Sequence, residues 1–262
     1  RANYEQSLAV LDQVDEDRAS VVRPDSSNSI AYVEMMGKSG KLSDPRVRQA
    51  LSHAFDRESV RLVAYSGKGE VDPSPLPTGS WAHVDLQGQP FDLEAAQAAL
   101  DDAGVSDLEV AIEMPAGFPE AEQMARVWQS NLAEIGVDLE ISVSELSVWL
   151  DAYVAREYDM TWNFFGVSPD PHSFFDVILR PHFGGDVYDN PRVEELVEAG
   201  ISTADREARE EIYAELQEIV VNEVPVMTVQ SRPVGAIVAD GVEGFAMNPL
   251  GWGLYHGVTL AE

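Results

Sequence analysis

The chain has 262 residues and no cysteine, and 46 acidic against 17 basic side chains give it a formal net charge of −29. Without cysteine, the sequence excludes disulfide scaffolds, thiolate metal sites and a cysteine nucleophile. The negative field opposes contact with phosphate backbones, so we expect no nucleic-acid partner. A hydrophobic content of 45% excludes a disordered acidic tail, and no apolar run reaches the roughly 20 residues that span a bilayer.

The basic residues are mostly arginine, since only Lys38, Lys41 and Lys68 are lysines. Self-repulsion at this net charge strains the compact state in dilute buffer, whereas salt at about 1 M shortens the Debye length to about 3 Å. We therefore expect a salt-adapted protein, as in halophilic organisms. The alternative is an ordinary acidic surface.

The first half of the chain predicts helices with clear ends. Ser43 or Asp44 can cap a helix that has Pro45 at its first position, Asp56 can cap the next helix, and Gly104 ends a third. The expected elements are an amphipathic helix over 4–14, a strand over 29–36, helices opening at 42–45 and at 56, a helix over 92–103 and a strand over 108–114. Residues 66–90, rich in proline and glycine, predict a long irregular loop, and such loops are often functional.

The second half predicts a repeated α/β pattern. Helices are expected over 120–135, 146–156, 191–199 and 205–223, and strands over 137–143, 158–165, 226–230 and 234–238. Strands that alternate with helices of this length predict an α/β fold with a mixed, mainly parallel sheet flanked by helices.

Catalytic motifs are absent from the sequence. It contains no Gly-x-Ser-x-Gly elbow, Walker loop, Gly-x-Gly-x-x-Gly run or His-Glu-x-x-His pair. Pairs of carboxylates carry no information, because 46 acidic residues form pairs by chance. We therefore expect no enzyme. A hydrolase that uses an acidic cleft and an adhesion or interaction module remain as alternatives.

The segment 163–185 is the strongest candidate for a binding site. An aromatic strand runs directly into a Gly/Ser/Pro loop that opens a helix near Pro171. Ligands of open α/β sheets sit at the carboxyl ends of strands, where loops and helix N-termini meet. The candidate contacts are Phe164, Phe165, Val167, Asp170, His172 and His182, with Trp81 from the irregular loop. In the alternative interpretation Asp170 only caps the helix and the aromatic residues belong to the core.

Residues 42–60, LSDPRVRQALSHAFDRESV, resemble the signature of the extracellular solute-binding proteins of family 5, the peptide- and nickel-binding receptors of ABC importers. The similarity continues in family order through FDLEAAQAALDDAG (91–104), IGVDLEISV (135–143), PDPHSFF (169–175), YAELQEIVVNEVPVMTV (213–229) and VEGF (242–245). The resemblance implies a periplasmic-binding-protein-like lobe. Residues 1–28 would be the tail of a preceding segment, 29–246 the C-terminal ligand-binding lobe, and 247–262 a return toward a missing N-terminal lobe.

The resemblance leaves two ligand classes open. Peptide-binding members carry an aspartate that holds the free amine of the peptide, and Val167 stands at that position here. Valine cannot pair an ammonium group, and Asp170 substitutes for it only if the loop bends differently. The nickel-binding branch is similar in residues 165–174 and places a metal-contacting histidine after an Arg-x-Pro segment, which implies His182 as a metal ligand. The transported ligand is then an oligopeptide or dipeptide, or nickel as a chelate.

The family resemblance also implies partners and a location. Two lobes would close on the ligand, and the membrane permease of an ABC importer would recognise the closed form. The chain would lie at the extracellular face of the membrane or in the periplasm, lipid-anchored through a missing N-terminus. The fragment is expected to be monomeric, and its acidic bias fits a haloarchaeal member.

Overall fold

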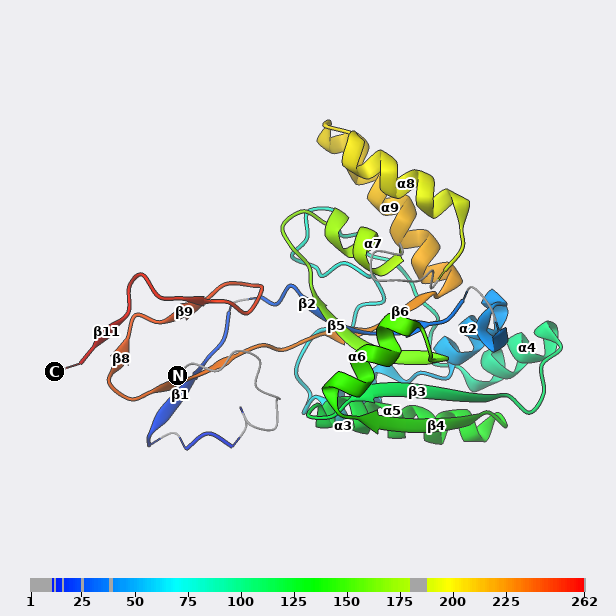
Figure 1. The fold of residues 1–262 in the computed structure, drawn as a ribbon, viewed down its shortest axis with the longest axis horizontal. Coiled ribbons are helices and arrows are strands. Elements are labelled where there is room, and N and C mark those ends of the chain that lie inside the picture. Colours follow the sequence, from blue (N-terminus) through cyan, green and yellow to red (C-terminus); the bar gives the residue numbers. More distant parts are fainter. Residues whose placement is uncertain are drawn as a thin grey trace.

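The computed structural model describes residues 11, 13–15, 17–24, 26–37, 40–179 and 188–261. These residues form an α/β body and a smaller β part that stands off from it (Figure 1). Most of the helix expected over 4–14 lies outside the described residues, as does His182.

The body is organised around a five-stranded sheet with the order β4-β3-β5-β2-β6. β3 pairs in parallel with β4 and β5, whereas β2 pairs antiparallel with β5 and β6. All strands except β2 therefore run in the same direction, which confirms the expected mixed, mainly parallel sheet. The strands are β2 (Ser29–Met35), β3 (Glu109–Pro115), β4 (Asp138–Ser144), β5 (Met160–Gly166) and β6 (Val226–Ser231).

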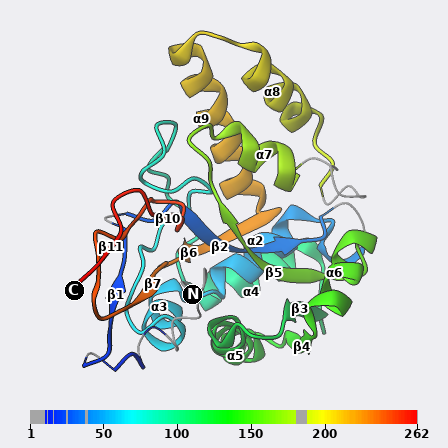
Figure 2. The same cartoon turned by 60° about the vertical axis from the view of Figure 1, so that its left-hand side comes forward.

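Helices cover both faces of this sheet (Figure 2). Because side chains alternate along a strand, Val33 of β2 joins one apolar core and Tyr32 joins the other. The first core packs under a short helix, η1 (Gly40–Leu42), and under α2 (Pro45–His53), α3 (Arg57–Ala64), α4 (Leu93–Ala103) and α5 (Pro119–Glu134). On the other face lie α6 (Leu146–Ala155), α7 (His172–Leu179), α8 (Pro191–Ser202) and α9 (Arg206–Glu223).

The predicted starts of α2 and α3 and the predicted end of α4 are confirmed, whereas α8 runs to Ser202, beyond the predicted end at 199. The carboxylates of Asp44, Asp56 and Asp92 each accept a hydrogen bond from a first-turn amide, and Gly104 ends α4 in the left-handed conformation with φ 69°. Residues 66–90 contain no helix or strand, as expected for the irregular loop. This loop lies along the outer edge of β6, where the Ser231 amide donates to the Glu70 carbonyl at 2.9 Å.

The smaller part consists of paired short strands. β1 (Ala19–Val22) pairs with β7 (Ala236–Ala239), β8 (Val242–Glu243) with β11 (Thr259–Leu260), and β9 (Ala246–Met247) with β10 (Gly253–Leu254). Only β7 overlaps an element expected from the sequence. Residues 236–246 thus pair outside the five-stranded sheet, and the lobe boundaries at 29 and 246 stay predictions.

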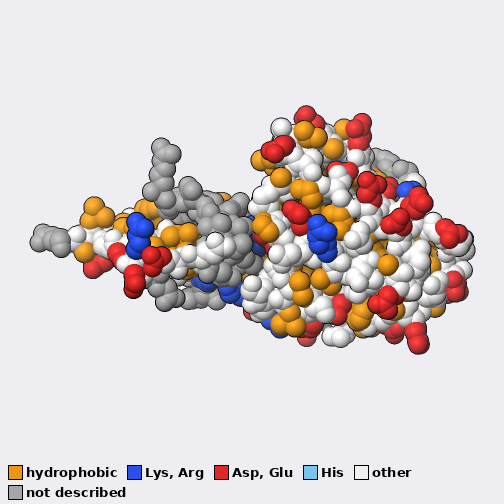
Figure 3. Space-filling model, turned by 90° about the horizontal axis from the view of Figure 1, so that it is seen from below, with side chains coloured by type: hydrophobic (Ala, Val, Ile, Leu, Met, Phe, Trp, Pro, Cys, Tyr) orange, Lys and Arg blue, Asp and Glu red, His pale blue; other side chains and the backbone are white. Residues whose placement is uncertain are grey.

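The surface of the body is acidic. Figure 3 shows many aspartate and glutamate side chains on one face of it and few lysine or arginine side chains. Among the described residues, no helix has the length and apolar character needed to cross a membrane.

Candidate functional site

The carboxyl ends of β3, β4, β5 and β6 meet at one edge of the sheet, because these strands run in the same direction. In Figure 1 this edge faces the smaller β part. The segments that leave it are 116–118 after β3, residue 145 after β4, the 167–171 loop after β5, and residues 232–235 after β6. Since open α/β sheets bind ligands at this place, this edge is the candidate functional site.

Two aromatic rings and an arginine come together at this edge. Phe164 of β5 and Phe118, which follows β3, have ring centroids 5.5 Å apart. The Arg232 guanidinium carbon, just after β6, lies 4.2 Å from the centre of the Phe164 ring and 5.6 Å from that of Phe118. A guanidinium at these distances is attracted by the negative ring faces, so the three side chains hold one another in place.

Arg232 has a buried carboxylate partner. Its Nη2 atom lies 3.8 Å from Glu120 Oε1, and the two side chains are only 4% and 3% exposed. Burial raises the pKa of the Glu120 carboxyl, and the nearby guanidinium opposes only part of that shift. A buried ion pair is stable only when further hydrogen bonds satisfy its polar atoms. The stability of the Arg232–Glu120 pair therefore depends on the polar groups around it.

Several polar atoms around this pair lack hydrogen-bond partners. The Tyr65 hydroxyl, Trp162 Nε1 and Arg232 Nε are buried, and none completes a hydrogen bond of normal geometry among the described atoms. Burial and the neighbouring Glu120 carboxylate also raise the pKa of the Tyr65 hydroxyl. An unsatisfied buried polar group costs about 1–3 kcal/mol, and Trp162 lies close enough to the Tyr65 hydroxyl to lower part of its raised pKa.

A second cluster joins the irregular loop to the segment after β5. Trp81 Nε1 donates to the Pro169 carbonyl at 2.9 Å, and Arg209 Nη2 donates to Asp170 Oδ1 at 2.7 Å. The Arg209 guanidinium carbon lies 5.3 Å from the centre of the Trp81 ring, and that of Arg206 lies 4.6 Å away. The structure thus brings Trp81 and Asp170 together around Arg209.

Asp170 also caps a helix. Its Oδ1 accepts a hydrogen bond from the His172 amide at 3.0 Å, at the start of α7. Partial burial raises the pKa of Asp170, but the hydrogen bonds from Arg209 and the His172 amide outweigh this effect and lower the pKa overall. The carboxylate is therefore charged and engaged, as the capping interpretation predicts, while more than half of its side chain stays exposed.

The remaining predicted residues are separated. Phe165 faces the opposite side of the sheet from Phe164 and packs edge-on against Phe174. Val167 is fully buried in the core with Phe174, so its placement gives no support to a ligand contact. His172 is half-buried, and its Nδ1 has no hydrogen-bond partner among the residues that the structure describes. Within the described ranges, no group of three or more His, Asp or Glu residues could hold a metal ion, and His182 lies outside them.

Four residues of the edge cluster were missed by the sequence analysis: Tyr65, Phe118, Glu120 and Arg232. The signal for two of them was present, because Phe118 and Arg232 lie within about four residues of the ends of the expected strands over 108–114 and 226–230. The rule that placed the segment after β5 in the site applies equally to those two strand ends. Tyr65 and Glu120 carry no comparable signal.

Comparison with known proteins identifies the family. Residues 3–185 match the family described as bacterial extracellular solute-binding proteins, family 5 Middle. The chain belongs to this family. Its α/β body is accordingly the fold of periplasmic-binding-protein-like structures, and the members of this family are extracellular or periplasmic solute-binding proteins.

Similar proteins bind several kinds of solute. The chain is 27% identical to heme-binding protein A of Haemophilus influenzae over 88% of its length, and 26% identical to the dipeptide-binding protein of Escherichia coli over 92%. It covers 44% and 49% of those relatives, so it spans about half their length. A dipeptide-binding protein of Pseudoalteromonas, solved with Met-Leu, superimposes with a TM-score of 0.86 at 26% identity, covering 97% of this chain and 52% of that one.

Proposed function

We propose that this chain is the C-terminal ligand-binding lobe of an ABC-importer receptor that takes up a small peptide or a nickel chelate. The observation that carries the proposal is the cluster of Phe118, Phe164 and Arg232 at the open carboxyl edge of the sheet. The rings offer apolar contact, and the Arg232 guanidinium beside them supplies positive charge. Membership of a solute-binding family and the similarity to dipeptide-binding proteins support this assignment.

The connections to the smaller β part suit a hinge. Residues 26–29 run beside Arg232 there, since the Arg232 amide donates to the Ser29 carbonyl and the Ser27 hydroxyl donates to the Arg232 carbonyl, each at 2.6 Å. Closure of two lobes rotates the backbone at such connecting residues. Arg232 belongs both to the connection and to the edge cluster, so it couples ligand contact to closure.

The rest of the proposal concerns the whole protein. In it, residues 1–28 and 247–262 connect the lobe to an N-terminal lobe, and the receptor acts without catalysis, as a monomer that delivers its ligand to a membrane permease. The protein lies outside the cytoplasmic membrane, with a lipid anchor, and comes from a haloarchaeon. The net charge of −29 supports this origin.

Calorimetric titration of the chain with Met-Leu and with nickel–histidine tests the proposal. We expect weak binding of one of the two, with Kd of order 1 mM, because a single lobe forms only one wall of the cleft. Phe118→Ala should weaken this binding, and Leu62→Ala should not, because Leu62 is 59% exposed on α3.

Two results would contradict the proposal. One is the absence of heat with both ligands at millimolar concentration. The other is cleavage of Met-Leu during the titration, which chromatography of the recovered peptide would reveal and which would favour a hydrolase.

A further inference from the structure

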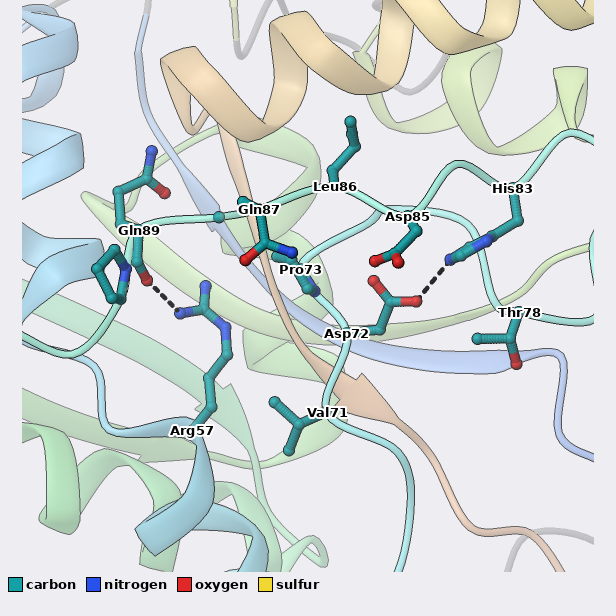
Figure 4. Close-up of a pocket in the computed structure, with 12 residues that line it drawn as sticks. Arg57, Val71, Asp72, Pro73, Thr78, His83, Asp85, Leu86, Gln87 and Gln89 are labelled. Atoms are coloured by element: carbon teal, nitrogen blue, oxygen red, sulfur yellow. Dashed lines mark hydrogen bonds and ion pairs between the residues drawn. The ribbon is translucent and has the colours of Figure 1, made fainter.

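A separate pocket lies between the irregular loop and the start of α3 (Figure 4). It has a volume of about 590 Å³, within the range of small-molecule sites. Arg57 lines this pocket from the first turn of α3, whereas Tyr65 of the edge cluster follows the last turn. Tyr65 lies eight residue steps after Arg57, about 12 Å along the helix axis, so the pocket is distinct from the candidate ligand edge.

Arg57 provides a positive charge with no negative partner. Its guanidinium donates to the Thr228 carbonyl at 3.3 Å, the Gln89 carbonyl at 3.3 Å and the Ser52 hydroxyl at 3.4 Å, all uncharged groups at long distances. Among the described residues, no carboxylate forms an ion pair with it or perturbs it. A guanidinium has five N–H groups, so donors remain for a further acceptor.

Arg57 is half-buried, and its guanidinium carbon lies 5.6 Å from the centre of the Phe55 ring. Removal from water lowers the pKa of the guanidinium to about 10, so it is still charged at neutral pH. A partly buried charge is stabilised by a partner of opposite charge, and a carboxylate meets a guanidinium through two parallel hydrogen bonds. The floor of the pocket therefore matches a carboxylate of the ligand.

The opposite wall carries negative charge. Asp72 is already engaged, since its Oδ2 lies 2.6 Å from His83 Nε2 and its Oδ1 accepts from the Ser74 amide at 2.8 Å. Asp85 is exposed and makes no interaction within the described part of the chain. In Figure 4 the Asp85 carboxylate lies beside that of Asp72, across the pocket from Arg57.

We propose that this pocket binds a small zwitterion, an α-amino acid with an aliphatic side chain. The ligand carboxylate pairs with Arg57, its ammonium group pairs with Asp85, and its side chain contacts Val71. A phosphate or other dianion is repelled by the two aspartates, and a simple cation is repelled by Arg57. Only a ligand that carries both a negative and a positive group can pair with Arg57 and with Asp85 at the same time.

Calorimetry of the full chain with L-leucine at low ionic strength tests this site. Two analogues separate the charges: isocaproate lacks the amine, and isoamylamine lacks the carboxylate. We expect saturable binding of L-leucine and binding at least about tenfold weaker for each analogue, since each loses one charge-assisted contact. The site is independent of the ligand edge, so Phe118→Ala should leave L-leucine binding unchanged.

Variants assign the contacts. Asp85→Asn should weaken L-leucine binding about tenfold without affecting folding, because this exposed carboxylate bonds to no other described residue. Arg57→Gln should abolish binding, with a thermal melt to confirm that the variant is folded. Asp151→Asn, on α6, is the matched control and should bind as the parent does. No heat with L-leucine, equal binding of isocaproate, or unchanged binding by Asp85→Asn would each overturn the proposal.

Discussion

A single carboxyl group under α6 illustrates how strongly surroundings determine the behaviour of a residue. Glu34 of β2 is fully buried, and it accepts hydrogen bonds from the Tyr153 hydroxyl at 2.8 Å and the Tyr158 hydroxyl at 3.0 Å. Arg156 Nη1 lies 3.6 Å from the same carboxylate. Burial nevertheless dominates and raises the pKa of Glu34 above its ordinary value. The folded protein therefore holds the Glu34 proton more tightly than the unfolded chain does.

This shift predicts a pH-dependent effect of Glu34→Gln. A raised folded pKa contributes stability that is fully present below the unfolded value of about 4.3 and is lost as pH rises through the folded value. Glutamine does not ionise, so the variant escapes this loss. We expect the free energy of unfolding of the variant, relative to the parent, to increase between about pH 4 and about pH 7. Urea titrations measure it, with exposed Glu207→Gln as control; a difference that stays flat or falls contradicts the assignment.

Residue-level chemistry could be predicted from the sequence only where local rules suffice. Asp170 follows a strand and precedes a helix, so both its capping role and its place at the carboxyl edge are visible in the sequence. Glu120 and Tyr65 become neighbours of Arg232 only through the packing of α3 and α5 against the sheet. No spacing along the chain encodes that contact.

At the scale of elements, the helix ends were the most predictable feature, because they depend on adjacent residues. The order of the strands was not predictable from the sequence. β2 lies between β5 and β6, and its side chains are buried in the apolar cores on both faces of the sheet. The two-residue strands β8 to β11 are too short for any apolar period. Their pairing depends on the approach of distant segments, and the sequence analysis missed them.

The cap of α4 gives a direct measure of such a local contribution. Asp92 Oδ1 accepts a hydrogen bond from the Ala95 amide at 2.9 Å, which satisfies one otherwise unpaired amide of the first turn. We expect Asp92→Ala to lower the free energy of unfolding by about 1 kcal/mol and Asp92→Asn to change it little. Urea unfolding of the two variants checks this. Equal losses in both would show that the negative charge at the helix start, rather than the cap hydrogen bond, carries the effect.

At the scale of the whole molecule, the net charge of −29 is the dominant feature. Several arginines are already paired, as in Arg192 with Glu215 at 2.6 Å and Arg206 with Glu210 at 3.1 Å. Since 17 basic residues cannot neutralise 46 acidic ones, most of the acidic surface in Figure 3 repels itself. Salt shortens the range of this repulsion from about 10 Å at 0.1 M to about 3 Å at 1 M.

Screening predicts that salt stabilises the fold. We expect the thermal midpoint to rise by about 5 °C or more between about 0.1 M and about 2 M KCl, a gain of about 1–2 kcal/mol for a chain of this size. Thermal melts followed by circular dichroism measure it. NaCl at the same ionic strength should give the same rise, because screening depends on ionic strength and not on the identity of the cation. A midpoint that stays constant or falls would show that the acidic surface costs little, and the salt-adapted interpretation would then be wrong.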